Sequence, residues 1–345
     1  MDVSLFAYHL PPELIAQEPA EPRDSSRLLV VDRARAGWED RRFGELPDLL
    51  EPGDCLVANE SKVIPARLLG TREGDGRPVE LLMLRPLTPT RWEALVRPGR
   101  RCRVGARLVV ADGLARATVV AEKERGLRVL DIEAERPVKE MLDRHGLPPL
   151  PPYIARHAAP RPEDRARYQT IYARHDGSVA APTAGLHFTA GLIRRLQCIG
   201  VEIHFLTLHI GAATFRPLTG ERVESHQIDP EAAEIPDDTA RAVNQARAEG
   251  RRVIAVGTTT TRALEWAAHE GGPIKPGRGA ADLYIYPGYA FRVVDGLITN
   301  FHLPRSSLLL LVSALCGREL LLKAYAHAVA ARYRFYSYGD AMLIV

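Results

Sequence analysis

The stretch at residues 179–189 carries residue types suited to ligand binding and proton transfer. It reads Val-Ala-Ala-Pro-Thr-Ala-Gly-Leu-His-Phe-Thr and surrounds one imidazole, His187, with Pro182, Thr183 and Gly185. Proline stiffens a loop, and small residues let a ligand approach the backbone. We interpret this segment, the His187 loop, as a holder for a polar or anionic ligand. A tight turn with His187 hydrogen-bonded to the backbone explains it about equally well.

A second stretch, residues 207–215, reads Thr-Leu-His-Ile-Gly-Ala-Ala-Thr-Phe. His209 is a candidate acid or base, and Gly211 and Thr214 are candidate substrate contacts. His204 and His209 are five residues apart in a predicted strand, so they point to opposite faces and cannot bind one metal ion together.

Two further strand ends carry polar groups. Gly257, Thr258, Thr259 and Thr260 follow a predicted strand and open a helix, an arrangement that suits a carboxylate or phosphate, although simple threonine capping explains it as well. Asn300 and His302 follow a second strand, and Asp282 opens a third. Because open α/β sheets place ligands at the carboxyl ends of their strands, we take His187, His209 and His302 as candidate catalytic residues, and we add Asp282 as a further candidate.

The elements that position these residues form an α/β pattern. Strands and helices alternate from residue 201 onward, which predicts a main domain with a mixed, largely parallel sheet flanked by helices. Thr189 is the expected N-cap of a helix at 190–199, and Gly200 its expected end. The other predicted strands are 27–32, 54–59, 201–210, 252–256, 282–286 and 297–301, and the other predicted helices are 43–50, 137–145, 237–248, 258–269, 306–316 and 319–332.

Between residues 70 and 132 the pattern changes to short β-like runs separated by glycine-rich breaks. This spacing predicts a small antiparallel β-barrel inserted at 70–149 into a main domain made of 1–69 and 150–345. The turn at 97–103, the arginine turn, contains four arginines that are candidate RNA contacts, and Arg67 is a fifth candidate. A solvated turn is the alternative. The four are Arg97, Arg100, Arg101 and Arg103.

Composition limits the class of protein. The net charge is +3, hydrophobic residues make up 46% and charged residues 26%, as in ordinary globular proteins. The four cysteines are scattered, which argues against a disulfide framework or a zinc ribbon. Without an apolar signal segment or a long apolar run, we expect a cytoplasmic protein. The sequence also contains no glycine-rich dinucleotide motif, P-loop or His-Glu-x-x-His.

Long, unusual strings along the chain closely resemble one family, the S-adenosylmethionine:tRNA ribosyltransferase-isomerases of queuosine biosynthesis. The resemblance runs nearly end to end and implies an α/β domain with an inserted barrel. The strings are 28–32, 59–68 (Asn-Glu-Ser-Lys-Val-Ile-Pro-Ala-Arg-Leu), 150–154, 168–172, 179–188, 207–215, 252–265, 285–304 and 333–342.

The resemblance implies transfer of the ribosyl part of S-adenosylmethionine onto 7-aminomethyl-7-deazaguanine at the tRNA wobble position. The ribose isomerises to give epoxyqueuosine, and adenine and methionine leave. The sulfonium acidifies the neighbouring C5′ protons, so one positioned base can start the reaction. The anticodon loop already presents unstacked bases. S-adenosylmethionine is then a consumed co-substrate, no metal or redox cofactor is needed, and we expect a monomer without membrane contact.

Three residues depart from the family pattern. Ala213 replaces a glycine, Asp229 replaces a histidine, and Glu60 stands where Asn or Asp is commoner. These departures keep two alternatives open: a divergent enzyme that uses S-adenosylmethionine on another acceptor, and a non-catalytic tRNA-binding module that depends on the arginine turn.

Overall fold

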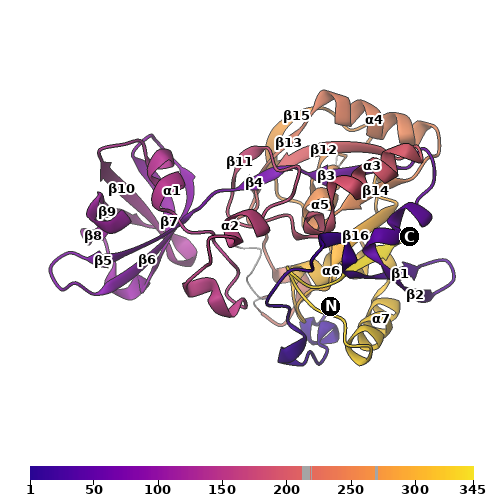
Figure 1. Cartoon of the computed structure of the whole chain (residues 1–345), viewed down its shortest axis with the longest axis horizontal. Coiled ribbons are helices and arrows are strands. Elements are labelled where there is room, and N and C mark those ends of the chain that lie inside the picture. Colours follow the sequence, from indigo (N-terminus) through magenta and orange to yellow (C-terminus); the bar gives the residue numbers. More distant parts are fainter. Residues whose placement is uncertain (212–217, 219, 269–270) are drawn as a thin grey trace. The chain divides into compact units, whose positions relative to one another are not determined.

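The computed structural model describes residues 1–345 except 212–217, 219 and 269–270, and it leaves the side chains of 157 and 158 undescribed. The chain forms two compact units, drawn in Figure 1. The sheet unit comprises Met1–Ser61, Gln169–His175 and Pro182–Val345, and the barrel unit comprises Lys62–Tyr168 and Asp176–Ala181. The boundary expected after residue 69 falls inside strand β5 (Arg67–Arg72), and the one expected after 149 falls inside the barrel unit.

The sheet unit is built on a nine-stranded mixed sheet, as its sequence pattern predicted. Its order is β15 (Gly277–Ala281), β13 (Glu231–Ile235), β12 (Glu202–Leu208), β3 (Cys55–Asn59), β14 (Val253–Val256), β16 (Gly296–Asn300), β17 (Ala341–Ile344), β1 (Arg27–Asp32) and β2 (Gly37–Arg42). Strands β12, β3, β14 and β16 are parallel neighbours. β17 is antiparallel to β16 and parallel to β1. The carboxyl ends of the four central strands therefore share an edge with the beginnings of β17 and β1.

The two faces of this sheet are covered by different elements. One face packs its core against α3 (Ala190–Cys198), the 3-10 helix η4 (Phe43–Asp48) and the His187 loop, through residues such as Ala58, Val256 and Ile298. Asn59, the next residue after Ala58, hydrogen-bonds Thr259 of α5 (Thr258–Ala267). Because neighbouring residues of a strand point to opposite faces, α5 lies on the second face.

Some helices begin at a side chain that caps their first turn, and α3 ends near a glycine. Thr189 caps α3 by accepting a hydrogen bond from Leu192 N at 3.1 Å, and Gly200 follows the helix with φ of 89°, as predicted. Ser306 caps α6 (Ser307–Cys316) in the same way through Leu309 N. The remaining helices are α4 (Asp237–Ala248), which contacts β3, β12 and β14, and α7 (Arg318–Ala330), which contacts α6.

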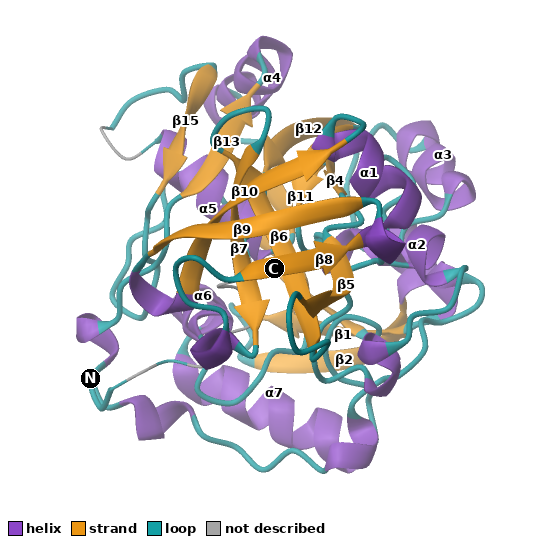
Figure 2. Cartoon of the chain, turned by 90° about the vertical axis from the view of Figure 1, so that its left-hand side faces the viewer, coloured by secondary structure: helices purple, strands orange, loops and turns teal. Residues whose placement is uncertain are grey.

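The barrel unit contains the small antiparallel barrel that the sequence predicted. Figure 2 looks onto its six strands, which close in the order β10-β7-β6-β5-β8-β9. They comprise β5, β6 (Pro78–Pro86), β7 (Arg91–Arg97), β8 (Arg107–Val110), β9 (Ala115–Glu122) and β10 (Leu127–Ala134). The unit also contains α1 (Val138–His145) and α2 (Asp164–Arg167), while β4 (Ser61–Val63) and β11 (His175–Ser178) form a separate two-stranded sheet. Among the described residues, no helix has the length and apolarity needed to cross a bilayer.

One predicted strand is wrong. Residues 282–286 contain no strand, and β15 lies just before them at Gly277–Ala281. The apolar Leu283 and Ile285 suggested a strand, but β15 is a sheet edge that pairs through its backbone with β13 and therefore needs no apolar alternation. Strands β2, β13 and β17 were also absent from the sequence prediction.

Candidate active site

The described polar residues gather at the shared edge of the sheet, where the parallel strands end. Asn59 ends β3, His209 follows β12, Gly257 follows β14, and Asn300 ends β16. Gly257 also meets the His187 loop, because a Cβ placed on it would lie 3.7 Å from Ala184 Cβ. The fold thus brings four chain segments together that the sequence flagged separately.

His187 is buried and uses both ring nitrogens. Its Nδ1 lies 2.8 Å from Ser26 Oγ, and its Nε2 lies 3.1 Å from Asn300 Nδ2. Because an amide nitrogen only donates, Nε2 accepts and Nδ1 carries the proton toward Ser26. The ring stacks on Phe43 at 4.9 Å, and burial lowers the pKa of His187 to about 4. This neutral imidazole, with a hydrogen bond at each ring nitrogen, is suited to holding the Ser26 and Asn300 side chains in place.

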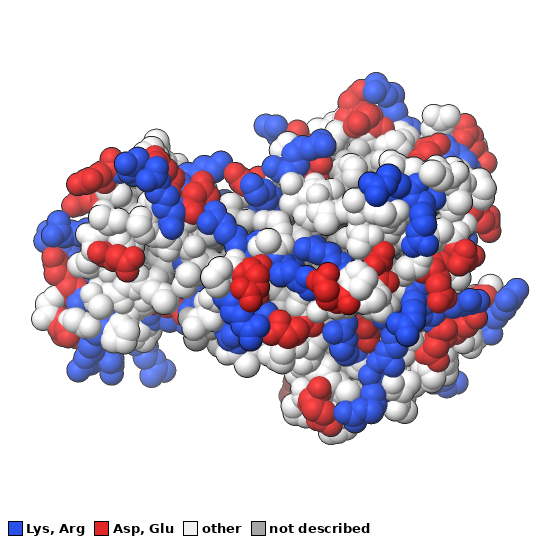
Figure 3. Space-filling view, viewed as in Figure 1, with Lys and Arg blue, Asp and Glu red and all other residues white. Residues whose placement is uncertain are grey.

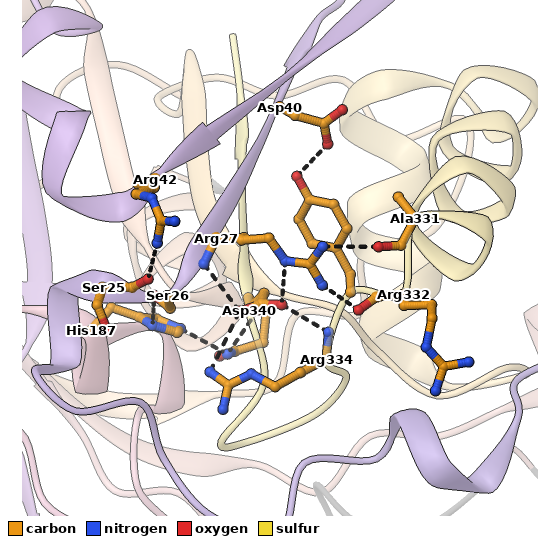
Figure 4. A network of polar contacts seen from close by, with 12 residues as sticks. Ser25, Ser26, Arg27, Asp40, Arg42, His187, Ala331, Arg332, Arg334 and Asp340 are labelled. Atoms are coloured by element: carbon orange, nitrogen blue, oxygen red, sulfur yellow. Dashed lines mark hydrogen bonds and ion pairs between the residues drawn. The ribbon is translucent and has the colours of Figure 1, made fainter.

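Asp340 anchors the strand beginnings beside this histidine (Figure 4). Its carboxylate accepts hydrogen bonds from Arg27 N at 3.0 Å and Arg334 N at 2.8 Å, and Arg27 Nε lies 3.3 Å away. Its carbonyl accepts from Asn300 Nδ2 at 3.5 Å. Asn300 Oδ1 is buried with no hydrogen-bond partner among the described residues. This buried carbonyl oxygen therefore keeps an unused capacity to accept a hydrogen bond.

His302 lies on the opposite face of the sheet. Its Nε2 is 2.7 Å from Thr299 Oγ1, and its backbone N–H donates to the Tyr325 hydroxyl at 2.9 Å. Burial lowers the pKa of His302 to about 3. Because Thr299 and Asn300 are neighbours in β16, the imidazoles that they bind are held on different faces. His187 and His302 therefore do not form one acid–base pair.

Gly185 is required by close packing inside the His187 loop. A Cβ at this position would lie 2.1 Å from the Tyr172 hydroxyl oxygen and 2.8 Å from Thr170 Cγ2. Both hydroxyls, Tyr172 Oη and Thr170 Oγ1, are buried without a hydrogen-bond partner in the described part of the chain. Because Gly185 has no side chain, the Tyr172 and Thr170 side chains can pack directly against the backbone of the His187 loop. Pro182 is buried and Thr183 half-buried in the same turn.

A buried ion pair at the same edge was not predicted from the sequence. Arg262 of α5 pairs with Glu231 at the start of β13, and Glu231 Oε1 also accepts from Gly211 N at 2.7 Å. Burial lowers the pKa of Arg262 to about 10, and its Nε has no hydrogen-bond partner among the residues described. Thr258 was singled out because it follows a predicted strand and opens a helix. Arg262 lies about one helical turn further along that helix, so the same sequence pattern could have pointed to it.

Arg262 lines a narrow pocket, the Arg262 pocket, with a volume of about 20 Å³. The starts of α5 and α6 both border it, through Thr258, Thr259 and Ser307. The pocket is lined by Ile228, Thr258, Thr259, Arg262, Ile285, Ser307, Leu308 and Leu311. Two helix N-termini and a buried guanidinium, which already pairs with Glu231, are groups that could hold an anion here.

The threonines of this turn have different roles. Thr260 Oγ1 donates to Val256 O at 2.8 Å and is fully buried, so its hydroxyl serves the helix. Thr258 and Thr259 line the Arg262 pocket, and Asn59 Nδ2 lies 3.4 Å from Thr259 Oγ1. Asn59 also bonds both backbone groups of Leu208, which fixes β3 against β12.

The other predicted site residues differ in their surroundings. His209 is half-buried, and its N–H donates to Ala232 O at 2.9 Å. Asp282 is exposed and borders a second cavity. Thr214 and the departure Ala213 lie outside the described residues. Glu60 is buried near His175 and Arg174, at 3.4 and 3.5 Å, so the longer side chain is accommodated through charge pairing.

The arginine turn is exposed in the barrel unit. Arg97, Arg100, Arg101 and Arg103 are all on the surface. Arg128 supports the turn from within, since its Nε donates to Cys102 O at 3.1 Å and its Nη2 to Gly99 O at 3.3 Å.

Arg67, by contrast, is only 5% exposed and pairs with Glu80 at 3.2 Å, so its guanidinium serves the barrel wall. On the face seen in Figure 3, basic and acidic side chains are intermingled over both units, so no single strongly basic surface stands out there. Across the described residues, no group of three or more His, Cys, Asp or Glu side chains is arranged to hold a metal ion.

Comparison with known proteins gives consistent full-length matches. The family profile described as "Queuosine biosynthesis protein" matches residues 3–344. A protein of Symbiobacterium thermophilum is 53% identical and one of Pelotomaculum thermopropionicum 52% identical, each over 100% of both chains, and both are named S-adenosylmethionine:tRNA ribosyltransferase-isomerase. The crystal structure of an S-adenosylmethionine tRNA ribosyltransferase from Thermotoga maritima is 38% identical, covers 99% of this chain and 100% of its own, and has a TM-score of 0.57.

Proposed function

This chain belongs to the queuosine biosynthesis protein family, and we propose on that basis that it is an S-adenosylmethionine:tRNA ribosyltransferase-isomerase. The enzyme transfers the ribosyl group of S-adenosylmethionine to 7-aminomethyl-7-deazaguanine at the tRNA wobble position and isomerises it. Epoxyqueuosine in tRNA, adenine and methionine are the products. Full-length identity of 53% to a relative of that name is the observation that carries this function.

S-adenosylmethionine is held by its methionine carboxylate in the Arg262 pocket. Arg262 is a buried cation with an unused Nε–H, and Thr258, Thr259 and Ser307 add hydroxyls at two helix starts. A charge-assisted hydrogen bond of this kind contributes about 1.5–3 kcal/mol. Because the pocket is narrow, only the carboxylate oxygens enter it, and they compete with Glu231 for the guanidinium.

We assign different roles to His187, His302 and His209. His187 and His302 are held neutral by burial and are bonded to Asn300 and Thr299, so we assign them orienting roles. His209 is half-buried at the same edge of the sheet and takes the acid–base role toward the C5′ proton. Asn300 Oδ1 accepts a hydrogen bond from the substrate.

The arginine turn contacts the tRNA backbone. Arg97, Arg100, Arg101 and Arg103 are exposed, which phosphate binding requires, whereas the buried Arg67 is excluded from this role. An enzyme that acts on tRNA is expected in the cytoplasm.

Adenine release tests this function. The protein is incubated with S-adenosylmethionine and tRNA that carries the 7-aminomethyl-7-deazaguanine base, and free adenine and methionine are measured by chromatography. Equal amounts of both, dependent on the modified base, are expected. Tight binding of tRNA and S-adenosylmethionine without any adenine would refute the reaction, and tRNA with unmodified guanine at the wobble position is the matched control.

A further inference from the structure

A second cavity lies in the sheet unit near the C-terminal end of α5. It has a volume of about 520 Å³ and combines aromatic with charged side chains. We call it the Trp266 cavity. Trp266 and Tyr284 supply the aromatic groups, Lys275 and Arg278 the positive charges, and Asp282 a carboxylate.

This cavity neighbours the Arg262 pocket along one helix. Arg262 and Trp266 are four residues apart in α5, so they lie on the same face, about 6 Å apart along the axis. The chain passes directly from one site to the other, since Asp282 and Tyr284 line the Trp266 cavity and Ile285 lines the Arg262 pocket. A ligand in the cavity therefore sits beside the proposed site of S-adenosylmethionine.

The indole is fixed by its contact with β15. A Cβ on Gly279 would lie 2.4 Å from Trp266 Cη2, so only a glycine lets this strand cross the ring edge. Lys275 is exposed, and Arg278 is 81% exposed. Arg278 pairs with Glu234 at 3.0 Å, but such solvated pairs contribute little and a phosphate can replace the carboxylate.

We propose that the Trp266 cavity binds one unpaired nucleotide of the tRNA, with its base against Trp266 and its phosphate at Lys275 and Arg278. Proteins recognise unpaired RNA by stacking bases on aromatic side chains and by pairing phosphates with cations. Lys275 and Arg278 at this cavity can bind a phosphate, a group that the adenosyl moiety lacks. Asp282 accepts a hydrogen bond from an amino group of the base. The inference rests on the proposed function, because it takes tRNA as the substrate.

The test separates tRNA binding from co-substrate binding. Two variants, Trp266→Leu and the exposed pair Lys275→Gln/Arg278→Gln, are compared with Arg35→Gln, which removes a charge at 88% exposure near the opposite edge of the sheet. The Kd for tRNA is measured between 50 and 200 mM salt on the log–log scale, together with the KM for S-adenosylmethionine in adenine release. Trp266→Leu should weaken tRNA binding about tenfold. The pair should reduce the log–log salt slope by about 1, while Arg35→Gln and the KM stay unchanged.

Two results overturn the proposal. A raised KM for S-adenosylmethionine with unchanged tRNA affinity would place the adenine of the co-substrate in the cavity. A wild-type Kd for tRNA and a wild-type KM in both variants would show that the Trp266 cavity binds neither substrate. The double variant changes only exposed side chains, so it decides the matter if Trp266→Leu fails to fold. Quenching of Trp266 fluorescence by a single-stranded RNA hexamer, taken as wild type minus Trp266→Phe, needs no turnover and therefore stands even if the proposed reaction fails.

Discussion

Asn300 Nδ2 donates to His187 Nε2 across 3.1 Å and joins the end of β16 to the His187 loop. The bond fixes the tautomer of the imidazole, so its remaining proton points to Ser26. The bond supports the positioning role that we propose for His187, since the nitrogen that would take a proton already accepts one hydrogen bond.

Replacing Asn300→Asp should raise the pKa of His187 well above its present value of about 4, because a carboxylate beside the ring favours the imidazolium. Proton NMR of the ring C–H signals across a pH titration measures the change. Thr299→Val is the matched control, since Thr299 faces His302 on the other side of the sheet. An unchanged His187 titration would show that the two side chains are not in contact.

Stability should fall as the pH is lowered from 6.5 to 5. Burial lowers the pKa of His187 to about 4 and that of His302 to about 3, below the unfolded value of about 6.5. The unfolded chain therefore binds more protons in this window, and stability rises with pH. The contribution of each imidazole to the slope of the free energy of unfolding rises from about 0.7 kcal/mol per pH unit at pH 6.5 toward about 1.4 at pH 5. Urea titrations at several pH values should show that His302→Gln removes about half of this histidine contribution, and an unaltered slope would contradict it.

Gly185→Ala should destabilise the sheet unit by about 1–3 kcal/mol, because the new methyl group meets the Tyr172 hydroxyl oxygen and Thr170 Cγ2. Adding Tyr172→Phe should restore part of the loss, which a double-mutant cycle in urea measures. Gly191→Ala in α3 is the control, since its Cβ would make only an ordinary contact, 3.8 Å from Thr189 Oγ1, and alanine favours a helix. Equal effects at the two glycines would refute the close packing.

Arg262→Gln should lower kcat/KM for S-adenosylmethionine about 10- to 100-fold, because it removes the cation that we propose binds the methionine carboxylate. Arg262→Lys should recover only part, since lysine lacks the planar fork of N–H donors. Adenine release and the Kd for tRNA are both measured, and the Kd should not change. The exposed Arg194→Gln on α3 is the control. A wild-type KM in Arg262→Gln would show that the methionine carboxylate of S-adenosylmethionine does not bind in this pocket.

Changing Arg100, Arg101 and Arg103 together to Gln should weaken tRNA binding and lower the log–log salt slope by about 2, as expected when three phosphate contacts to single-stranded RNA are lost. Filter binding at several salt concentrations measures the slope. Arg91→Gln, at the other end of β7, should leave both quantities unchanged. If the control and the triple variant behave alike, the arginine turn does not contact tRNA.

Local signals in the sequence predicted many of the elements. Thr189 and Gly200 bracket α3, strand β1 has its predicted bounds, and the even spacing of short strands identified the barrel. These features depend on hydrogen bonds and steric limits within a few residues, so they can be read without the fold. The long strings shared with the queuosine family identified the family in the same direct way.

Only the tertiary structure decided how the site is assembled. Glu231 and Arg262 are 31 residues apart and meet because β13 and α5 are placed by the whole sheet. His187 and His302 looked equivalent in the sequence, but the alternation of Thr299 and Asn300 along β16 holds them on opposite faces. Strand order and side-chain direction are long-range properties, since they depend on which distant segments pair, and no local pattern specifies them.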